Sequence, residues 1–257
     1  MDEIIKKFAS DEVYYSDYSF VTNSQLGLIK RSPATYQYYR ENPSVRPVTK
    51  ALNFGRAFHM CMLEHDKYEK EVVVEPDVNK RTKVGKEKYQ EFLTMHDGMT
   101  ILTLDEYESL KGMRNKLTAS TEAMDLLSGG VAEQVNVWNN KDSNVPCKGK
   151  ADYWNKDKRI LVDIKTTQDS SPEGFRKSAY KYGYDRQASF YLDGFQADEF
   201  WFVVIEKSAP YNMAIYNCSE DFLLEGRSKY QQLLNVYSYY FIQELFDPYE
   251  HVYTGTL

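Results

Sequence analysis

The sequence predicts an α/β fold in which a mixed central β-sheet is flanked by helices. From Arg159 to Lys165, polar and apolar residues alternate with a period of two, which indicates a half-buried strand. Residues 199–206 form an almost wholly apolar run, typical of a central strand buried on both faces. Segments with helix-capping residues precede and follow these strands, so we expect helices to cover the sheet.

Residues 149–165 predict a β-hairpin, the feature on which the functional interpretation rests. The polar run 155–158 has the composition of a hairpin turn. A turn centred between Lys156 and Asp157 pairs Asp152 with Leu161 and Lys150 with Asp163.

In this register, Asp152, Asp163 and Lys165 share one face of the sheet. The opposite face is apolar and consists of Ala151, Tyr153, Ile160, Val162 and Ile164. Diagonal cross-strand neighbours are about 7–8 Å apart, so the two carboxylates can converge on one hard divalent cation. A solvated hairpin could carry the same residues by chance, and spacing alone does not separate the two readings.

Two helices are predicted near the amino terminus. Residues 22–24, Thr-Asn-Ser, supply N-cap chemistry for a helix that ends at about Lys30. Pro33 is suited to the first turn of the next helix, which ends at about Glu41. The basic residues of this region form either a solvated surface or a lip that contacts phosphates: Lys30, Arg31, Arg40, Arg46, Lys50 and Arg56.

Residues 50–65 predict a strongly apolar helix. Gly55 and His59 lie one turn apart on one face, and Gly55 would let a backbone or a ligand approach closely. His59 is either a core residue or a ligand. A short strand at 70–75, a basic segment at 79–88 and helices near 85–95, 104–119 and 121–127 follow.

Residues 131–138 predict a strand beside the hairpin. Its odd-numbered face places Glu133 among three valines, and burial of an unpaired carboxylate is costly. A metal, a lysine or exposure at the end of the strand would each resolve this. The pairing brings Glu133 near Asp152.

The rest of the chain predicts helices at 172–181 and 184–193, a strand at 212–218 and a long helix at 221–245. Gln187 and Tyr191 share one face of the second helix. We expect a single domain over residues 1–257. It has a helical part at about 1–130, a catalytic sheet core at about 131–218 and a C-terminal helix at about 220–245.

Composition restricts the compartment and the class of partner. The net charge is −6, so binding to nucleic acid requires basic residues gathered locally. Cys61, Cys147 and Cys218 form no Cys-x-x-Cys pair, which indicates reduced thiols and not an iron–sulfur or zinc site. The sequence shows neither a signal-peptide apolar region nor an apolar run of roughly 20 residues, so we expect a cytoplasmic protein without a membrane partner.

Several motifs occur in one order along the chain: residues 22–33, Gly55-Arg-Ala-Phe-His59, Gly149-Lys-Ala-Asp152, Asp163-Ile-Lys165 and Gln187-Ala-Ser-Phe-Tyr191. Together they resemble the PD-(D/E)XK nuclease superfamily, and within it the RecE-type exonuclease VIII of phage recombination systems. The resemblance spans about residues 15–205 and implies a restriction-endonuclease-like core. The Asp at 163 replaces the Glu of many members, and both are found in the superfamily.

The resemblance also implies site roles. Asp152, Asp163 and the carbonyl of Ile164 would bind Mg²⁺, with Mn²⁺ able to substitute. His59 would be a further metal ligand. Glu133 matches an acidic position less firmly, and Lys165 would be the catalytic lysine, acting as a base or as an electrostatic stabiliser.

Gln187 and Tyr191 match a DNA-positioning helix, and we expect Lys30, Arg31, Arg56 and Arg186 to contact phosphates. The resemblance implies an exonuclease that digests double-stranded DNA ends in a bacterial or phage-infected cell. It also implies a ring-shaped homo-oligomer and a single-strand annealing partner. The cysteine spacing excludes the branch with an iron–sulfur cluster.

Three other readings stay open at this point. The chain could be an endonuclease or a single-strand nuclease of the same superfamily. It could be a catalytically silent module that binds DNA ends or a recombination partner, because a fold does not fix a function. It could also be a scaffolding protein whose hairpin acids are solvated.

Overall fold

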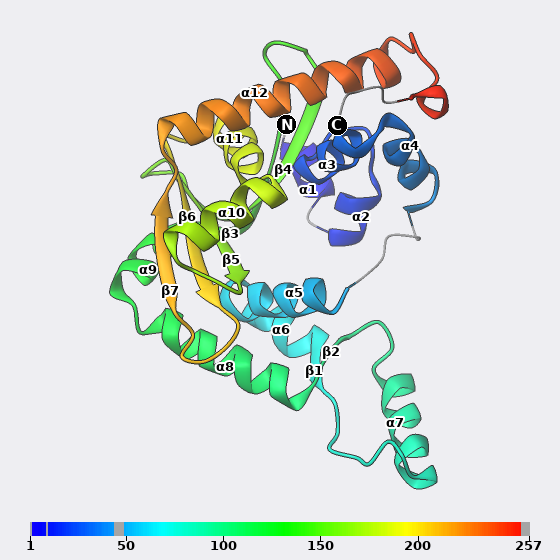
Figure 1. Ribbon diagram of the computed structural model, residues 1–257, viewed down its shortest axis with the longest axis vertical. Coiled ribbons are helices and arrows are strands. Elements are labelled where there is room, and N and C mark those ends of the chain that lie inside the picture. Colours follow the sequence, from blue (N-terminus) through cyan, green and yellow to red (C-terminus); the bar gives the residue numbers. More distant parts are fainter. Residues whose placement is uncertain (1, 9, 44–48, 253–257) are drawn as a thin grey trace.

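A computed structural model describes residues 2–8, 10–43 and 49–252 of the chain (Figure 1). Arg46, expected in the basic amino-terminal region, lies outside these ranges. Five strands form the central sheet: β3 (Val131–Asn139), β4 (Pro146–Asn155), β5 (Ile160–Thr167), β6 (Glu199–Glu206) and β7 (Met213–Asn217). They lie in the order β3-β4-β5-β6-β7, and β5 and β6 are parallel while the other neighbours are antiparallel. The predicted mixed sheet flanked by helices is confirmed.

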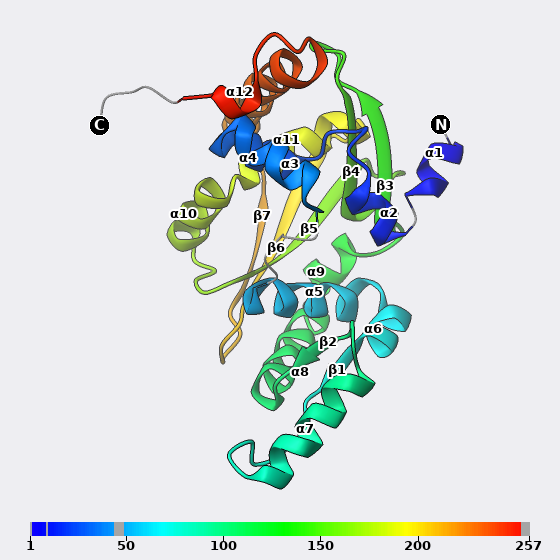
Figure 2. The ribbon, with the colours of Figure 1, turned by 90° about the vertical axis from the view of Figure 1, so that its right-hand side faces the viewer.

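One face of the sheet is covered by α5 (Lys50–Leu63), α8 (Leu104–Thr118) and α9 (Thr121–Leu126). Their buried side chains pack with those of β4, β5 and β6, and they include Phe58, Met113, Tyr153, Val162, Ile164 and Val203. Figure 2 shows α5 crossing the lower end of the sheet, with α8 below it. Thr103 caps α8 through a capping box, as its sequence predicts.

The opposite face is covered by α10 (Pro172–Tyr182), α11 (Tyr184–Phe195) and α12 (Glu220–Tyr237). Their core includes Leu161, Phe175, Ala188, Phe200, Phe202 and Val204. The last helix was predicted to reach residue 245. It ends earlier, at Tyr237, and a short π-helix, Ser238–Ile242, continues it.

The helices α3 (Asn23–Arg31) and α4 (Pro33–Glu41) begin as predicted. Thr22 caps α3 through a capping box with Gln25, and Ser32 caps α4 ahead of Pro33. Both helices pack with α11 and α12 around a core that includes Leu26, Tyr36, Cys147, Phe190 and Leu234.

Two short helices at the amino terminus, α1 (Asp2–Lys7) and α2 (Asp11–Ser16), were not predicted. Phe8 and Tyr14 pack against Val135 and Val137 of β3. Lys148 is fully buried beneath them, and its ammonium donates to the carbonyls of Tyr14 and Asp17 at 2.8 and 2.7 Å. This lysine therefore fastens the amino-terminal helices to β4.

A small arm projects from the α5 side of the molecule (Figure 1). It contains α6 (His65–Glu71), α7 (Lys83–Met95) and a parallel pair of strands, β1 (Val72–Val74) and β2 (Thr100–Leu102). The strand β2 was missed because its three residues are too few to show a period. No helix among the described residues is long and apolar enough to cross a bilayer.

The hairpin of β4 and β5 exists, but its predicted register is wrong by two residues. Trp154, not Asp152, pairs with Leu161, and the loop consists of residues 156–159. Arg159 belongs to this loop and has a φ of +56°, so it does not begin the strand. A shift of two residues keeps each side chain of β5 on its predicted face.

The alternation of β4 is broken between Asp152 and Tyr153. Tyr153 packs with Val162 and Ile164 on the α5 face as predicted, whereas Ala151 packs with Leu161 on the α11 face. The predicted grouping of Ala151 with Tyr153 is therefore wrong. The prediction that Asp152 shares one face with Asp163 and Lys165 is wrong as well, because Asp152 contacts His59 of α5 while Asp163 and Lys165 contact Gln187 and Tyr184 of α11. The break lies at the point where β4 and β5 separate, and it turns Asp152 toward α5.

We expect Gly226→Ala to destabilise the fold, because a Cβ at this position of α12 would lie 2.0 Å from the carbonyl oxygen of Asp185 in α11. Overpacking of this kind costs about 1–3 kcal/mol of unfolding free energy. Urea unfolding measures the loss. Gly55→Ala is the matched control, since Gly55 also lies inside a helix and no atom of the described residues is within 4 Å of the position of its Cβ. Equal stability of the two variants would contradict this packing.

Candidate active site

The site begins where β4 and β5 stop pairing. Their ladder of paired residues ends at Tyr153 and Val162, so the backbone N–H and carbonyl of Ile164 have no partner in β4. The N–H of Ile164 donates instead to Oδ2 of Asp152 at 2.9 Å. Its carbonyl oxygen lies 2.7 Å from Nε2 of His59 in α5. Side chains of the site thus replace the missing strand partner, as buried backbone groups require.

Three potential metal ligands converge at this gap. One ligand atom each from His59, Glu133 and Asp152 lies within 4.8 Å of the others. Nδ1 of His59 is 3.3 Å from Oδ2 of Asp152. Glu133 comes from β3, where its φ of +50° interrupts the regular strand. Residues other than glycine rarely adopt this backbone conformation, so the surrounding contacts must hold Glu133 in it.

Asp163 and Lys165 extend the site along β5. The carboxylate of Asp163 is only 2% exposed. Its Oδ1 accepts a hydrogen bond from Nε2 of Gln187 at 2.5 Å, and its Oδ2 lies 2.6 Å from the Lys165 ammonium. The ring of Tyr184, at the start of α11, lies 4.8 Å from the same ammonium. These contacts hold Asp163 and Lys165 in fixed positions.

The carboxylates of the site repel one another in a buried place. Burial, followed by the charge of Asp152, raises the pKa of Glu133 to about 7 and that of Asp163 to about 6. Burial alone would lower the pKa of Lys165, but Asp163 and Asp152 raise it well above its usual value. Without a bound cation the site therefore carries a charged lysine and carboxylates that ionise reluctantly.

A second charged network, which sequence reasoning missed, supports Glu133. The ammonium of Lys150 lies 3.2 Å from Oε2 of Glu133 and is hydrogen-bonded to Asp11 of α2. Asp11 also accepts from Lys67 of α6 at 2.6 Å. The Gly-Lys-Ala-Asp spacing could have indicated Lys150, since residues 150 and 152 are two apart on one strand. Nothing in the sequence pairs it with Asp11.

The donor atoms fit a hard divalent cation. Carboxylate and carbonyl oxygens suit Mg²⁺ and Mn²⁺, and a neutral imidazole suits Mn²⁺ as well. Oδ2 of Asp163 is buried, and its close partner is the Lys165 ammonium at 2.6 Å. Among the described residues, the ligand atoms that converge within 4.8 Å come from His59, Glu133 and Asp152, and Asp163 lies beside this group. A cation next to these acids would reduce the repulsion between them.

Of the basic residues expected to bind DNA, some are exposed and one is buried. Lys30 and Arg31 are exposed at the end of α3. Arg56 is exposed on α5 and forms an ion pair with Glu71 at 2.9 Å. Arg186 is buried, with 6% of its surface exposed, and its guanidinium donates to Asn23 of α3. Its expected phosphate contact does not fit this position, because the side chain joins α11 to α3.

Gln187 and Tyr191 both face the sheet from α11. Gln187 donates a hydrogen bond to Asp163, so its side chain is already engaged within the site. Tyr191 packs against Gly149 of β4, where a Cβ would lie 2.9 Å from its ring. The Gly149 of the motif is thus needed for the close approach of α11 to β4.

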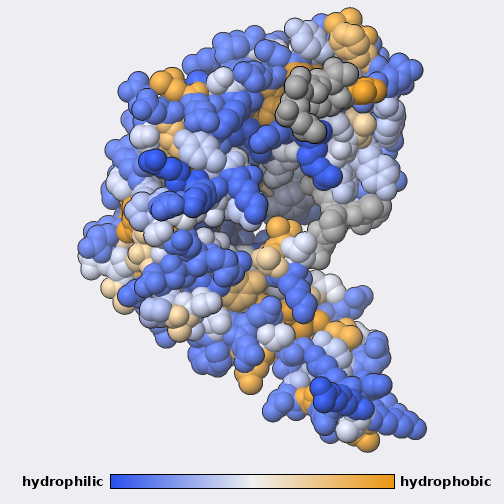
Figure 3. Space-filling view, viewed as in Figure 1, coloured by the Kyte–Doolittle hydropathy of each residue, from blue (hydrophilic) through white to orange (hydrophobic). Residues whose placement is uncertain are grey.

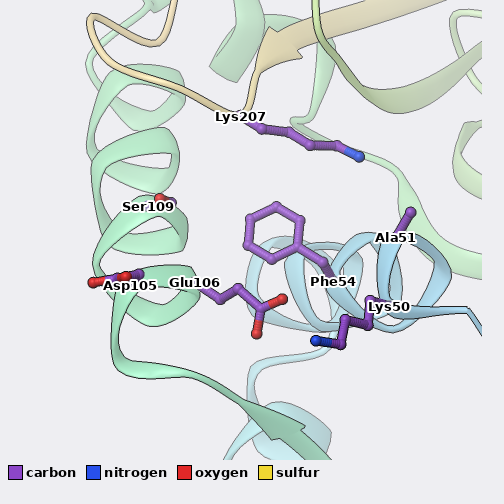
Figure 4. A pocket seen from close by; sticks show the side chains of 7 residues that line it. All are labelled: Lys50, Ala51, Phe54, Asp105, Glu106, Ser109 and Lys207. Carbon is purple, nitrogen blue, oxygen red and sulfur yellow. The ribbon is translucent and has the colours of Figure 1, made fainter.

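Two depressions lie near α5. Figure 3 shows the surface hollowed between the part that carries α3 and α10 and the part that carries α5. A separate pocket of about 260 Å³ lies between α5, α8 and the end of β6 (Figure 4), and Phe54, Glu106 and Lys207 are among its lining residues. None of the converging acids lines this second pocket.

We expect the metal-free protein to lose stability as the pH rises from about 5 to about 8. The pKa of Glu133 is about 7 in the folded state against 4.5 ordinarily, so folding favours its protonated form. That contribution is complete below the lower value and is lost as the pH passes the higher one. Melting temperatures measured in EDTA test this against Glu133→Gln, which cannot titrate. Parallel curves for the two proteins across this range would contradict it.

Comparison with known proteins shows the family to which the chain belongs. The model of a family described as PDDEXK-like domain of unknown function (DUF3799) matches residues 22–245. A comparison with curated proteins gave no match. The match covers the strands, α5 and α11, and it confirms the resemblance to PD-(D/E)XK nucleases.

Solved structures agree on the fold. A protein from Eubacterium rectale, provisionally named an exonuclease, superposes with a TM-score of 0.64 and 12% identity, over 98% of this chain and 94% of that one. At this identity the likeness shows the fold alone. A phage-related exonuclease from Haemophilus somnus 129PT reaches only a TM-score of 0.32 at 14% identity, over 67% of this chain and 91% of its own. The chain belongs to the family of PDDEXK-like domains.

Proposed function

We propose that the protein is a metal-dependent deoxyribonuclease that hydrolyses phosphodiester bonds at the ends of duplex DNA. The observation that carries this proposal is the convergence of Asp152, Glu133 and His59 beside the buried pair of Asp163 and Lys165. The family match supports a nuclease, and the name of the Eubacterium rectale protein supports an exonuclease. Digestion from an end would leave single strands for recombination.

Asp152, Asp163 and the carbonyl of Ile164 would hold Mg²⁺, with His59 and Glu133 completing the site or holding a second ion. The cation, when bound, lowers the pKa of a water ligand and polarises the scissile phosphate. Nε2 of His59 donates to the Ile164 carbonyl oxygen and Nδ1 lies 3.3 Å from Oδ2 of Asp152, so α5 sets the position of the ligands relative to β5.

Lys165 acts in this proposal as a cation. Its raised pKa and its contact with Asp163 favour the charged form, which would offset negative charge that develops on the phosphate. A role as general base would require the opposite shift. Gln187 keeps Asp163 oriented, and Tyr184 limits the movement of the Lys165 ammonium.

The DNA would lie in the hollow between α3, α10 and α5 (Figure 3). Lys30, Arg31 and Arg56 are exposed basic residues that could contact phosphates around an otherwise acidic protein. In this proposal the subunits form a ring that encloses the duplex. A single-strand annealing protein receives the product.

We expect linear duplex DNA to be degraded with Mg²⁺ while covalently closed circular DNA stays intact. Asp163→Asn should reduce the rate about 10³-fold or more, because a neutral amide replaces a ligand of the cation. Asp157→Asn, an exposed aspartate in the same hairpin, is the matched control and should cut at the wild-type rate. Gel assays on both substrates measure this.

Each departure from this result has a distinct meaning. Cutting of closed circles would identify an endonuclease instead. If the wild-type protein cuts neither substrate but its melting temperature rises with Mn²⁺, the chain is a silent binding module. Full activity in Asp163→Asn would remove the proposed site.

Lys165→Met should lower kcat about 10²-fold or more, because one positioned cation is lost from the transition state. Metal binding should persist, so the increase in melting temperature on adding Mn²⁺ is expected to remain. Lys158→Met, in the exposed loop of the hairpin, controls for the loss of a positive charge. Single-turnover kinetics on end-labelled DNA give the rate. An unchanged kcat would contradict the role of Lys165.

A further inference from the structure

One glycine of α5 has no structural reason to be a glycine. The described residues include seven glycines inside helices, and six of them lie against a neighbouring group that a Cβ would approach within 3.3 Å or less: Gly27, Gly85, Gly112, Gly174, Gly194 and Gly226. At Gly55, no atom of the described residues outside the adjoining backbone of α5 lies within 4 Å of the position that a Cβ would take. Its φ is not in the left-handed region either.

This glycine carries a cost that the fold does not recover. Glycine in the interior of a helix is less favourable than alanine, because it loses more backbone freedom on folding and adds no side-chain contact. Gly55 lies in the middle of α5, away from both ends of the helix. Packing within the described part of the chain therefore gives no reason for the free space in front of it.

The space lies next to the site. Gly55 is one helical turn before His59, so both residues are on the same face of α5. His59 on this face contacts Ile164 and Asp152. One turn corresponds to about 5.4 Å along the axis. The bare backbone at Gly55 thus lies one helical turn from His59, a ligand of the proposed metal site.

We propose that Gly55 keeps α5 free of a side chain so that the sugar–phosphate backbone of the DNA strand can pass over it, next to the scissile phosphate. Lys50 is exposed at the start of the same helix, and the exposed Arg56 follows Gly55 in the sequence, with its guanidinium on Glu71 at 2.9 Å in the absence of DNA. This inference rests on the proposed nuclease function and specifies how its substrate lies. In this inference Gly55 contacts the DNA backbone, and only the small size of the residue matters for that contact.

Gly55→Ala separates this role from a structural one. The variant is expected to melt about 2 °C higher than the wild type, because the helix gains alanine without a clash. Its KM for linear duplex DNA should rise about tenfold, and Gly55→Leu should raise it further, since the added volume displaces the strand. The increase in melting temperature with Mn²⁺ should stay as in the wild type, because no ligand is altered.

Gly98→Ala is the matched control. Gly98 also has no atom within 4 Å of a Cβ, but it lies in the loop between α7 and β2 and has a φ of +79°. We expect it to lower the melting temperature and leave KM unchanged. If the wild-type protein cuts DNA and Gly55→Ala and Gly55→Leu cut it with unchanged KM, the inference is wrong. If the wild-type protein cuts no DNA, the proposed function fails first.

Discussion

The site depends on the separation of two strands at Ile164. The backbone of Ile164 has lost its partner in β4, and a buried amide or carbonyl without a partner costs free energy comparable to a hydrogen bond. Asp152 accepts from the amide, and His59 bonds the carbonyl. The same contacts that satisfy the backbone therefore place an acid and an imidazole beside the carbonyl that would bind a cation.

Other features of the fold follow from this opening. Glu133 lies opposite Asp152 in the register of β3 and β4, its positive φ interrupts the ladder there, and Lys150 with Asp11 holds its carboxylate. On the other side of β5, Gln187 and Lys165 hold Asp163 in a buried position. The sheet thus presents acids from two faces to one opening, where burial and then the charge of Asp152 raise the pKa values of Glu133 and Asp163.

Much of this arrangement could be predicted from local patterns. Strand alternation indicated β5, the apolar run indicated β6, and capping residues located α3, α4 and α8, because each pattern reflects contacts within a few residues. The proximity of Glu133 to Asp152 followed from pairing neighbouring strands. The hairpin register was wrong by two residues because the loop is 156–159 and not 155–158: Asn155 pairs with Ile160, and Arg159 belongs to the loop with a positive φ.

The features that were missed depend on long-range contacts. Lys148 and Lys150 are separated by more than 130 positions from Tyr14 and Asp11, and no local pattern links them. Arg186 was expected to contact phosphates, yet it is buried and donates to Asn23 of α3. The fold of this chain is thus encoded largely in local patterns, whereas the support of its site is encoded in distant pairs.

Anomalous diffraction from crystals soaked in Mn²⁺ tests the central claim most directly. The account predicts an anomalous peak at the gap between β4 and β5, within about 2.0–2.6 Å of carboxylate oxygens of Asp152 and Asp163. A fully loaded crystal whose peaks all lie elsewhere, with the Asp163 carboxylate still held only by Gln187 and Lys165, would contradict it.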